Sequence, residues 1–205
     1  MTPSVLILAL GCGAARAGAR AEAAWVLPTL KDPHLVDAFG TFGPHGGEVR
    51  AGWGARFVDV GVRLGGAVSS GRQVAADGRV SEDEEHLLIV PVAVDATVRL
   101  DLLPEGRQPV VPFVRAGLGG LAWRDSWDDP GVEQVVWGVR RGWEAGGGLA
   151  LRLDAIDPEG ASAAVAGSGI LDSWIVAEWR RSWTVQDAGL DFGRSAWRLA
   201  LAVDW

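Results

Sequence analysis

Beyond about residue 47 the sequence alternates between two kinds of residue, and this alternation constrains the fold more than any other feature. Residues 143–154 and 195–205 place mostly apolar residues at every second position, with charged or small residues between them. Successive residues of a β-strand point to opposite faces, so each segment has one apolar face and one polar face. The same pattern predicts strands over residues 48–57, 58–69, 87–102, 111–124 and 172–183.

Each predicted strand is about as long as the 9–11 residues with which a tilted strand crosses a membrane. The longest apolar run, Val5–Leu10, is far shorter than the ~20 residues of a membrane-spanning helix. A hydrophobic content of 48% excludes a disordered chain. With 26 acidic and 19 basic residues, the chain offers no electrostatic basis for binding nucleic acid.

The charges on the polar faces indicate which face points inward. These faces balance arginines against acids: Arg50, Arg56, Arg63, Arg99, Arg115, Arg152, Arg180 and Arg198 against Glu48, Asp59, Asp95, Asp101, Glu144, Asp154, Glu178 and Asp204. Many glycines on the same faces leave room for long side chains. A water-facing surface would also carry Lys, Thr, Gln and Asn, and buried charges must be paired. We therefore expect ion pairs inside a barrel and apolar faces toward lipid.

The residues that we expect to form these interior ion pairs are the eight arginines together with Asp59, Asp95, Glu144 and Glu178. The lumen of a small barrel is filled by side chains and leaves no pore. The opposite arrangement, a soluble ligand-binding barrel with its apolar face inside, is the alternative interpretation of the same pattern.

Tryptophans near the predicted strand ends indicate a membrane interface, where aromatic girdles lie. They are Trp123, Trp143, Trp183, Trp197 and Trp205. A core position is the ordinary alternative for any one of them.

The amino terminus has the pattern of a secretory signal peptide over residues 1–23. The apolar run is followed by three sequences that fit an A-x-A cleavage site, ending at Ala17, Ala21 and Ala23. Cys12, the one cysteine of the chain, would leave with the signal or carry a lipid. The barrel domain is then expected over 24–205, with its first strand somewhere within 24–43.

The position of that first strand is the weakest part of the prediction. Ala24–Leu30 contains Pro28, which strands tolerate mainly at edges or ends, and Phe39–Phe42 is a poor alternative. Between strands, Asp157 followed by Pro158 is typical of a helix start, with an N-cap and Pro at the first position. It predicts a short helix in the 155–169 connection.

No motif for catalysis, a cofactor or a metal ion is present. His34, His45 and His86 lie in weak or loop segments, and only Ser81 near His86 could form a nucleophile pair. The acidic residues 81–85 are expected to be a solvated loop and not a calcium site. We expect no catalytic, cofactor-binding or metal-binding residues.

The order of these segments resembles a known family. The strand 195–205 with its terminal aromatic is similar to the assembly signal of bacterial outer-membrane β-barrels, and 89–119 resembles the middle hairpin of OmpA/OmpX-like barrels. Leu151–Asp154, Asp157-Pro158 and the segment 174–183 are similar to a group of uncharacterised outer-membrane barrels. The resemblance implies an all-β, eight-stranded antiparallel up-and-down transmembrane barrel with its N-terminus in the periplasm. It implies no catalytic or binding residues.

This resemblance sets the expected partners and location. The chain would lie in the outer membrane among its lipids, and the strand ending in Trp205 would engage the barrel-assembly machinery. The long segments 71–86 and 124–142 would be loops available to an extracellular partner. A structural or surface-interaction role is the leading hypothesis, with a small passive channel and a lipid-processing enzyme as rivals.

Overall fold

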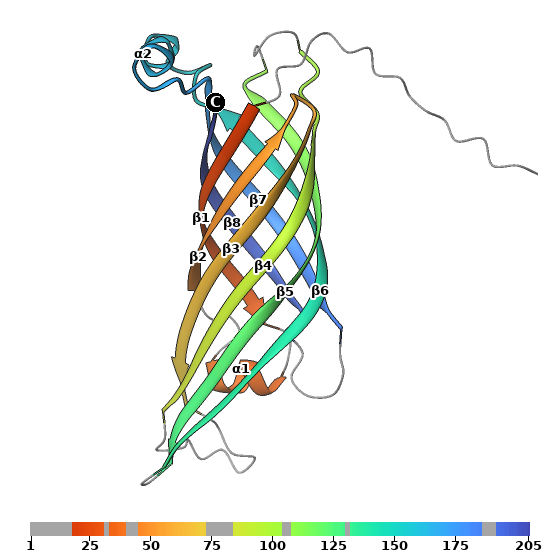
Figure 1. The fold of residues 1–205 in the computed structure, drawn as a ribbon, viewed down its shortest axis with the longest axis vertical. Coiled ribbons are helices and arrows are strands. Elements are labelled where there is room, and N and C mark those ends of the chain that lie inside the picture. The colour runs from red at the N-terminus through yellow and green to blue at the C-terminus, as the bar shows by residue number, and fades with distance from the viewer. Residues whose placement is uncertain are drawn as a thin grey trace, which may run out of the picture.

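The computed structural model describes residues 18–30, 33–39, 45–72, 84–103, 108–129, 132–185 and 192–205. Eight antiparallel strands follow one another around a closed barrel, each paired with its sequence neighbours, and β8 pairs with β1 (Figure 1). They are β1 (Gly18–Leu30), β2 (His45–Gly54), β3 (Val58–Gly71), β4 (Glu85–Arg99), β5 (Val110–Asp129), β6 (Val132–Arg152), β7 (Asp172–Thr184) and β8 (Arg194–Asp204). The predicted eight-stranded up-and-down barrel is confirmed.

The first strand begins earlier in the sequence than predicted. β1 includes the candidate Ala24–Leu30 but starts at Gly18, and its pairing with β8 runs from Arg20 to Leu30. The pairing of β1 with β2 ends at Val26, two residues before Pro28. Pro28 lacks an N–H group, but at this position there is no β2 residue for it to bond. Of the alternative Phe39–Phe42, Phe39 ends helix α1 (Pro33–Phe39), and residues 40–42 lie outside the described part of the chain.

The two ends of the barrel differ in their connections. We call the end with Gly18, Trp205 and helix α2 (Pro158–Ser168) the terminal end, and the end with α1 and the β5–β6 tip the hairpin end (Figure 1). At the terminal end β2 and β3 are joined by only Ala55–Phe57. β5 and β6 have 20 and 21 residues and extend past the other strands at the hairpin end.

The long β5–β6 hairpin corrects one prediction. Residues 124–142 are not a loop, because β5 continues to Asp129 and β6 begins at Val132. The two strands stay paired as far as Asp129 and Val132. The Asp, Gly and Trp residues of this segment resemble a loop in composition, but Val135, Val136 and Val139 favour an extended strand. Likewise, the predicted 71–86 loop is shortened by β3 and β4, and its residues 73–83 lie outside the described chain.

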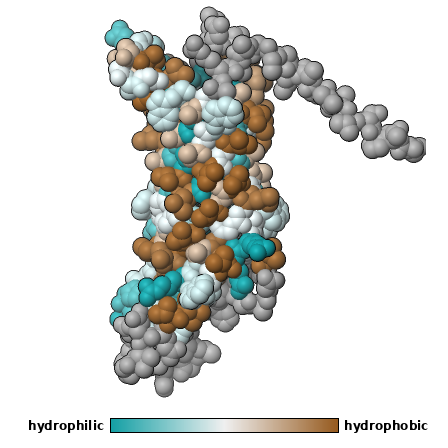
Figure 2. Space-filling model, in the orientation of Figure 1, coloured by the Kyte–Doolittle hydropathy of each residue, from teal (hydrophilic) through white to brown (hydrophobic). Residues whose placement is uncertain are grey.

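The barrel wall is apolar outside and charged inside. Outward Val62, Leu118 and Leu201 are 55%, 73% and 63% exposed, whereas inward Arg50 and Glu178 are 2% and 0% exposed. Figure 2 shows many apolar side chains on the face of the barrel wall that it draws. This arrangement is the reverse of a soluble ligand-binding barrel, and it matches a barrel surrounded by lipid.

The predicted helix in the 155–169 connection is confirmed as α2. The Asp157 carboxylate accepts a hydrogen bond from the Gly160 amide at 3.0 Å, which makes Asp157 the N-cap. Pro158 occupies the first helical position, and Gly169 ends the helix with φ of 73°, a left-handed conformation that glycine adopts without strain. No α2 residue is buried, so the helix lies outside the barrel core.

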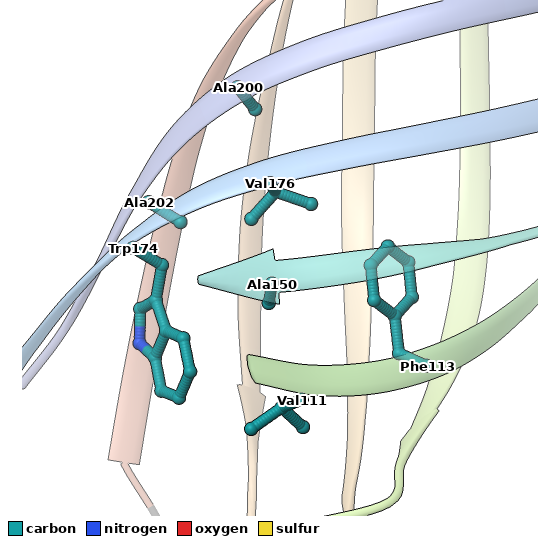
Figure 3. Packing of buried hydrophobic residues seen from close by; sticks show 7 residues of the cluster. All are labelled: Val111, Phe113, Ala150, Trp174, Val176, Ala200 and Ala202. Carbon is teal, nitrogen blue, oxygen red and sulfur yellow. The ribbon is translucent and has the colours of Figure 1, made fainter. Parts of the chain in front are cut away.

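Three groups of side chains point into the interior. The terminal cluster is apolar and consists of Val111, Phe113, Ala150, Trp174, Val176, Ala200 and Ala202, drawn in Figure 3. The charged layer is the set of ion pairs described below. The hairpin cluster is apolar and consists of Leu30, Leu35, Leu87, Ile89, Leu121 and Phe192, with Val36, Phe39 and Trp123 packed against it. Helix α1 supplies Leu35 to this cluster, so this unpredicted helix contributes to the packing inside the hairpin end.

Candidate functional site: the ion-paired lumen

The charged layer is organised around one carboxylate, that of Glu22 on β1. Its oxygens lie 2.7 Å from Arg198 Nη2, 2.9 Å from Arg115 Nη2, 3.0 Å from Arg20 Nε and 3.5 Å from Arg50 Nη1. These four arginines come from β8, β5, β1 and β2. All five side chains are at most 5% exposed. One buried negative charge therefore ties together four strands.

Two more glutamates extend the layer on the β7 side. Glu178 Oε2 accepts hydrogen bonds from Arg115 Nη1 at 2.9 Å and Arg198 Nη1 at 3.3 Å. Glu48 accepts from Arg180 Nη2 at 2.8 Å and from Arg198 Nε at 2.9 Å. Because Arg198 contacts Glu22, Glu178 and Glu48, the network is continuous across the barrel interior.

A second branch lies on the β3–β4 side. Arg50 Nη2 contacts Asp59 at 2.5 Å and Asp95 at 2.7 Å, and Arg99 contacts the other oxygen of Asp59 at 2.5 Å. Thr97 Oγ1 accepts a hydrogen bond from Arg115 Nε at 2.9 Å. This branch joins the first one through Arg50 and Arg115.

The remaining predicted lumen residues also find partners. Arg63 pairs with Glu144, and Arg180 Nε lies 3.7 Å from the other oxygen of Glu144. Arg56 Nε lies 3.1 Å from Asp101, which also contacts Arg152 Nη2 at 3.3 Å. Every one of the twelve candidates thus lies in an ion pair within the described chain.

Glycines on the inner wall make space for the largest of these side chains. A Cβ added at Gly61 would lie 2.5 Å from Arg50 Cζ, and one at Gly52 would lie 2.6 Å from Arg50 Nη1. Such contacts are inside van der Waals distance, so glycine at both positions leaves room for the Arg50 guanidinium where it lies. The glycines noted in the sequence therefore have a packing reason at these two positions.

Sequence reasoning missed the residue at the centre of the network. Glu22 and its neighbour Arg20 fall within residues 1–23, which were assigned to a signal peptide. A signal was present, because Ala19-Arg20-Ala21-Glu22-Ala23 alternates small and charged residues in the same way as the later strands. Reading that alternation as a strand would have found both residues.

At the terminal end a chamber of about 380 Å³ opens next to the charged layer. It is lined by Arg152, whose guanidinium carbon lies 4.4 Å from the centre of the Trp174 ring, and by Asp172 at 3.3 Å from Arg152 Nε. Asp172 is at the first position of β7, outside the apolar band. Burial, together with the charges of Asp154 and Asp204 and against the opposing charge of Arg152, raises the pKa of Asp172 to about 6.

A pair of buried acids lies at the other end of the interior. Glu85 and Asp125 face inward and are 6% and 7% exposed. The neighbouring outward residues of β5, Arg124 and Ser126, are polar, so this level lies beyond the apolar band. Burial, followed by the hydrogen bond with Glu85 and the repulsion from its charge, raises the pKa of Asp125 to about 7.

The predicted interface tryptophans divide into two groups. Trp143 and Trp183 stack with ring centres 3.9 Å apart, and Trp197 and Trp205 are 62% and 43% exposed on the outer wall. Trp123 departs from the prediction, because it lies on the inward face of β5 and packs on Phe192 at 5.3 Å. Its odd-numbered neighbours Leu121 and Asp125 are also inward and buried. Proximity to a strand end was therefore a weaker guide than the alternation itself.

The other residues considered for chemistry do not come together in the described chain. His86 is exposed on the outward face of β4, His45 stacks near Trp25, and Ser81 and His34 have no described side-chain position. Within the described residues, no group of three or more His, Cys, Asp or Glu side chains could hold a metal ion. Of the helices described, neither is long and apolar enough to cross a membrane.

Comparisons with known proteins agree with the geometry. No protein-family model matches the sequence, and no curated protein matches it. The fold is similar to that of Ail, the attachment invasion locus protein of Yersinia pestis, solved with the heparin analogue sucrose octasulfate. The two are 11% identical with a TM-score of 0.54, over 92% of this chain and 99% of that chain.

Two further solved structures are similar over nearly the whole chain. Neisserial surface protein A is 14% identical, with a TM-score of 0.48, over 92% of this chain and 95% of that one. The N-terminal β-barrel domain of Pseudomonas aeruginosa OprF is 10% identical, with a TM-score of 0.48, over 92% and 97%. Ail is an outer-membrane protein. The chain therefore has the fold of the small eight-stranded outer-membrane β-barrels, as the sequence resemblance implied.

Proposed function

We propose that this protein is an outer-membrane β-barrel whose lumen is closed and whose role is structural or in surface interaction. In this proposal the terminal end faces the periplasm and the hairpin end faces outward. The fold and the exposed apolar wall support the membrane location. The proposal includes neither catalysis nor a cofactor.

The observation that carries the closed lumen is the continuity of the charged layer. Glu22, Glu48 and Glu178 each contact at least two arginines, and these come from strands all around the barrel. An ion that crossed this layer would have to separate buried pairs, and removing one partner from such a pair costs about 3–5 kcal/mol. The hairpin cluster adds an apolar barrier at the far end.

Planar-bilayer recording tests this proposal against the channel alternative. The refolded barrel is first verified by gel mobility, because a closed barrel runs anomalously unheated and shifts to its chain mass on boiling. The wild-type protein should show no stable open conductance. Glu22→Gln should produce brief openings, whereas Glu159→Gln on exposed α2 should not. A stable conductance of the wild-type protein would favour a passive channel.

The β5–β6 hairpin is the proposed working surface. Trp137 and Val139 lie on one face of this hairpin and are 75% and 64% exposed, with Val135 beside them at 43%. This apolar face continues from the level of Ala122 past Arg124 toward the tip of the hairpin, and an exposed apolar face favours contact with another surface. Cells that display the wild-type chain should adhere to polystyrene more than cells that display Trp137→Ser/Val139→Ser. Equal adherence at equal surface expression would contradict this role.

The boundary of the signal peptide is proposed to fall after Ala17. Of the three A-x-A sequences, only Ala15-Arg16-Ala17 ends before β1, and cleavage after Ala23 would remove Glu22 with its buried ion pairs. N-terminal sequencing of the mature protein should begin at Gly18. A mature chain beginning at Ala24 would show that the barrel closes without Glu22.

The last strand is proposed to carry the signal for the barrel-assembly machinery. β8 pairs with both β7 and β1, and the Trp205 amide donates to the Ala19 carbonyl at 2.9 Å, so this strand closes the barrel. Deleting Trp205 should lower the amount of folded barrel in the outer membrane. Unchanged amounts of folded, heat-shifting barrel would exclude this role for Trp205.

A further inference from the structure

Arg194, at the start of β8, is a buried arginine that the ion-pair network leaves without a partner. It lies on the inward face of the strand and is 8% exposed. Within the described part of the chain, its guanidinium makes no hydrogen bond and no ion pair. The arginines of the charged layer, in contrast, each contact a carboxylate. A buried charge is costly unless a charge of opposite sign compensates it, so Arg194 calls for a counter-ion.

Arg194 lies at the boundary between the charged layer and the hairpin cluster. On the inward face of β8 it is separated from Arg198 of the charged layer by Ala196. Its β1 partner is Leu30 of the hairpin cluster, and its β7 partner is Ser182. Apolar neighbours on one side therefore prevent bulk water from solvating this charge freely.

The nearest acid to act on Arg194 is already shared by other arginines. The charge of Glu48 attracts Arg194, while that of Arg180 repels it. Glu48 contacts Arg180 at 2.8 Å, Arg198 at 2.9 Å and Arg63 at 3.5 Å. One carboxylate that faces three arginines does not neutralise a fourth.

A cavity of about 40 Å³ lies beside Arg194 and contains further hydrogen-bond donors. Arg63 also lines it, and Arg63 Nη1 is a buried donor with no acceptor in the described chain. The Ser182 hydroxyl lines the same cavity. Glu144 is the acid among the lining residues, but its two oxygens already face Arg63 and Arg180. The available groups are thus donors, and they favour an anion.

The size of the cavity restricts the kind of anion. One water molecule needs about 10–15 Å³ of such space, so this cavity admits only a few particles of that size. Much of the remaining lining is small or apolar: Ala93, Gly119, Leu121 and Gly142. A monatomic anion suits these dimensions better than a phosphate or a carboxylate ligand.

We propose that this cavity binds one halide ion, of which chloride is the natural example, between Arg194 and Arg63. The Ser182 hydroxyl donates a hydrogen bond to the ion. The ion compensates the charge of Arg194 and completes the charged layer on its hairpin side. This site goes beyond the proposed function, because it depends on neither the orientation of the barrel nor its surface role.

Chloride-dependent unfolding of the refolded barrel in detergent micelles tests the site. Chloride replaces gluconate at constant ionic strength, and unfolding in urea is followed by tryptophan fluorescence. An ion that binds only the folded state stabilises it by mass action. For a site half-filled at about 20 mM, raising chloride from about 10 to about 300 mM should lower the unfolding equilibrium constant about tenfold.

Two variants assign this effect to the cavity. Arg194→Met should lose the dependence, leaving less than about a twofold change. Arg181→Gln is the matched control, because Arg181 is an exposed arginine on the outer face of β7, and it should keep the tenfold change. In gluconate, Arg194→Met should be at least as stable as wild type, since it removes an unpaired buried charge. A clear loss of stability there would show that Arg194 has a partner within the protein, and would overturn the proposal.

The unheated gel shift first verifies that each variant forms the barrel. A wild-type protein that does not respond to chloride, or an equal response in Arg194→Met, would overturn the proposal, because water alone would then solvate the guanidinium. Phosphate that stabilises as strongly as chloride through Arg194 would overturn the choice of a monatomic ion. Wild-type crystals soaked in bromide, which need no variant, should show an anomalous peak in the cavity beside Arg194. An empty or water-filled cavity in such crystals would exclude the halide.

Discussion

Two different layers occupy the interior of this barrel, the charged layer in its middle and the hairpin cluster near one end. The charged layer relies on specific partners, such as Glu22 with its four arginines. The hairpin cluster relies on apolar burial, with Leu87, Ile89 and Phe192 each 1% exposed. The charged layer thus occupies the lumen through paired charges, and the hairpin cluster occupies it through packed apolar side chains.

The two layers should respond differently to substitution. Removing one member of a buried ion pair leaves an uncompensated charge in a medium that solvates it poorly. Removing part of an apolar side chain leaves a cavity that its neighbours can partly fill. We therefore expect the charged layer to be the more sensitive of the two.

The largest expected effect is that of Glu22→Gln. The variant leaves four arginines around a neutral amide, so the free energy of unfolding should fall by about 3–5 kcal/mol. Denaturant unfolding in micelles, followed by tryptophan fluorescence, measures this change. Glu159→Gln on exposed α2 serves as the control and should stay near wild type. A loss below about 1 kcal/mol would mean that the arginines find other acceptors.

Leu87→Ala tests the hairpin cluster and should have a smaller effect. We expect the free energy of unfolding to fall by about 2–3 kcal/mol, in the lower part of the range for buried leucines, because the cluster lies near an open end. The adjacent Leu88 faces outward and is 39% exposed, so Leu88→Ala is the matched control. Equal losses of stability in Leu87→Ala and Leu88→Ala would mean that burial in the hairpin cluster contributes no more to stability than the outer wall does.

The buried acids at the hairpin end predict a pH dependence. The pKa of Asp125 is about 7 in the folded chain and near 4 when unfolded, so the folded state binds more protons between these values. Stability should therefore rise as the pH falls from about 7 toward 4. Asp125→Asn should reduce this rise and stabilise the barrel at pH 8. Midpoints of denaturant unfolding at pH 5 and pH 8 measure both effects, and an unchanged pH slope in the variant would contradict the assignment.

The smallest expected effect is that of Asp157→Ala at the N-cap of α2. The helix should lose about 1 kcal/mol of local stability. Because no α2 residue is buried, unfolding of the barrel should not change. Hydrogen exchange at the Gly160 amide should become faster while exchange in β7 stays constant. Faster exchange in β7 would show that α2 supports the barrel after all.

Most of the fold could be predicted because strand alternation is a local property. The positions of β2 to β8 follow from period-two patterns, and α2 follows from Asp157 and Pro158. One element, β1, was predicted only over its second half, and another, α1, was not predicted. β1 overlapped the small-residue pattern of a signal peptide, and α1 has only seven residues, too few for a helical period to be visible.

The candidate site was predictable in its composition but not in its pairing. Arginines and acids of the polar faces were recognised as lumen residues, yet nothing local indicates that Arg198 should contact Glu22, Glu48 and Glu178 together. Those contacts join residues up to 176 positions apart, here Glu22 and Arg198, and arise only from the register of a closed sheet. Residues 124–142 of the β5–β6 hairpin were predicted to be a loop because their composition combines loop-like Asp and Gly residues with strand-favouring valines.

The sequence by itself determined that this chain forms strands with one apolar and one charged face, and that charge balance favours the charged face inside. These properties depend on residue type and spacing alone. Only the tertiary structure decided which strand begins the barrel, which charges meet and where Trp123 points. Closure of the sheet brings distant residues to the same level, and that level depends on register, which no local pattern encodes.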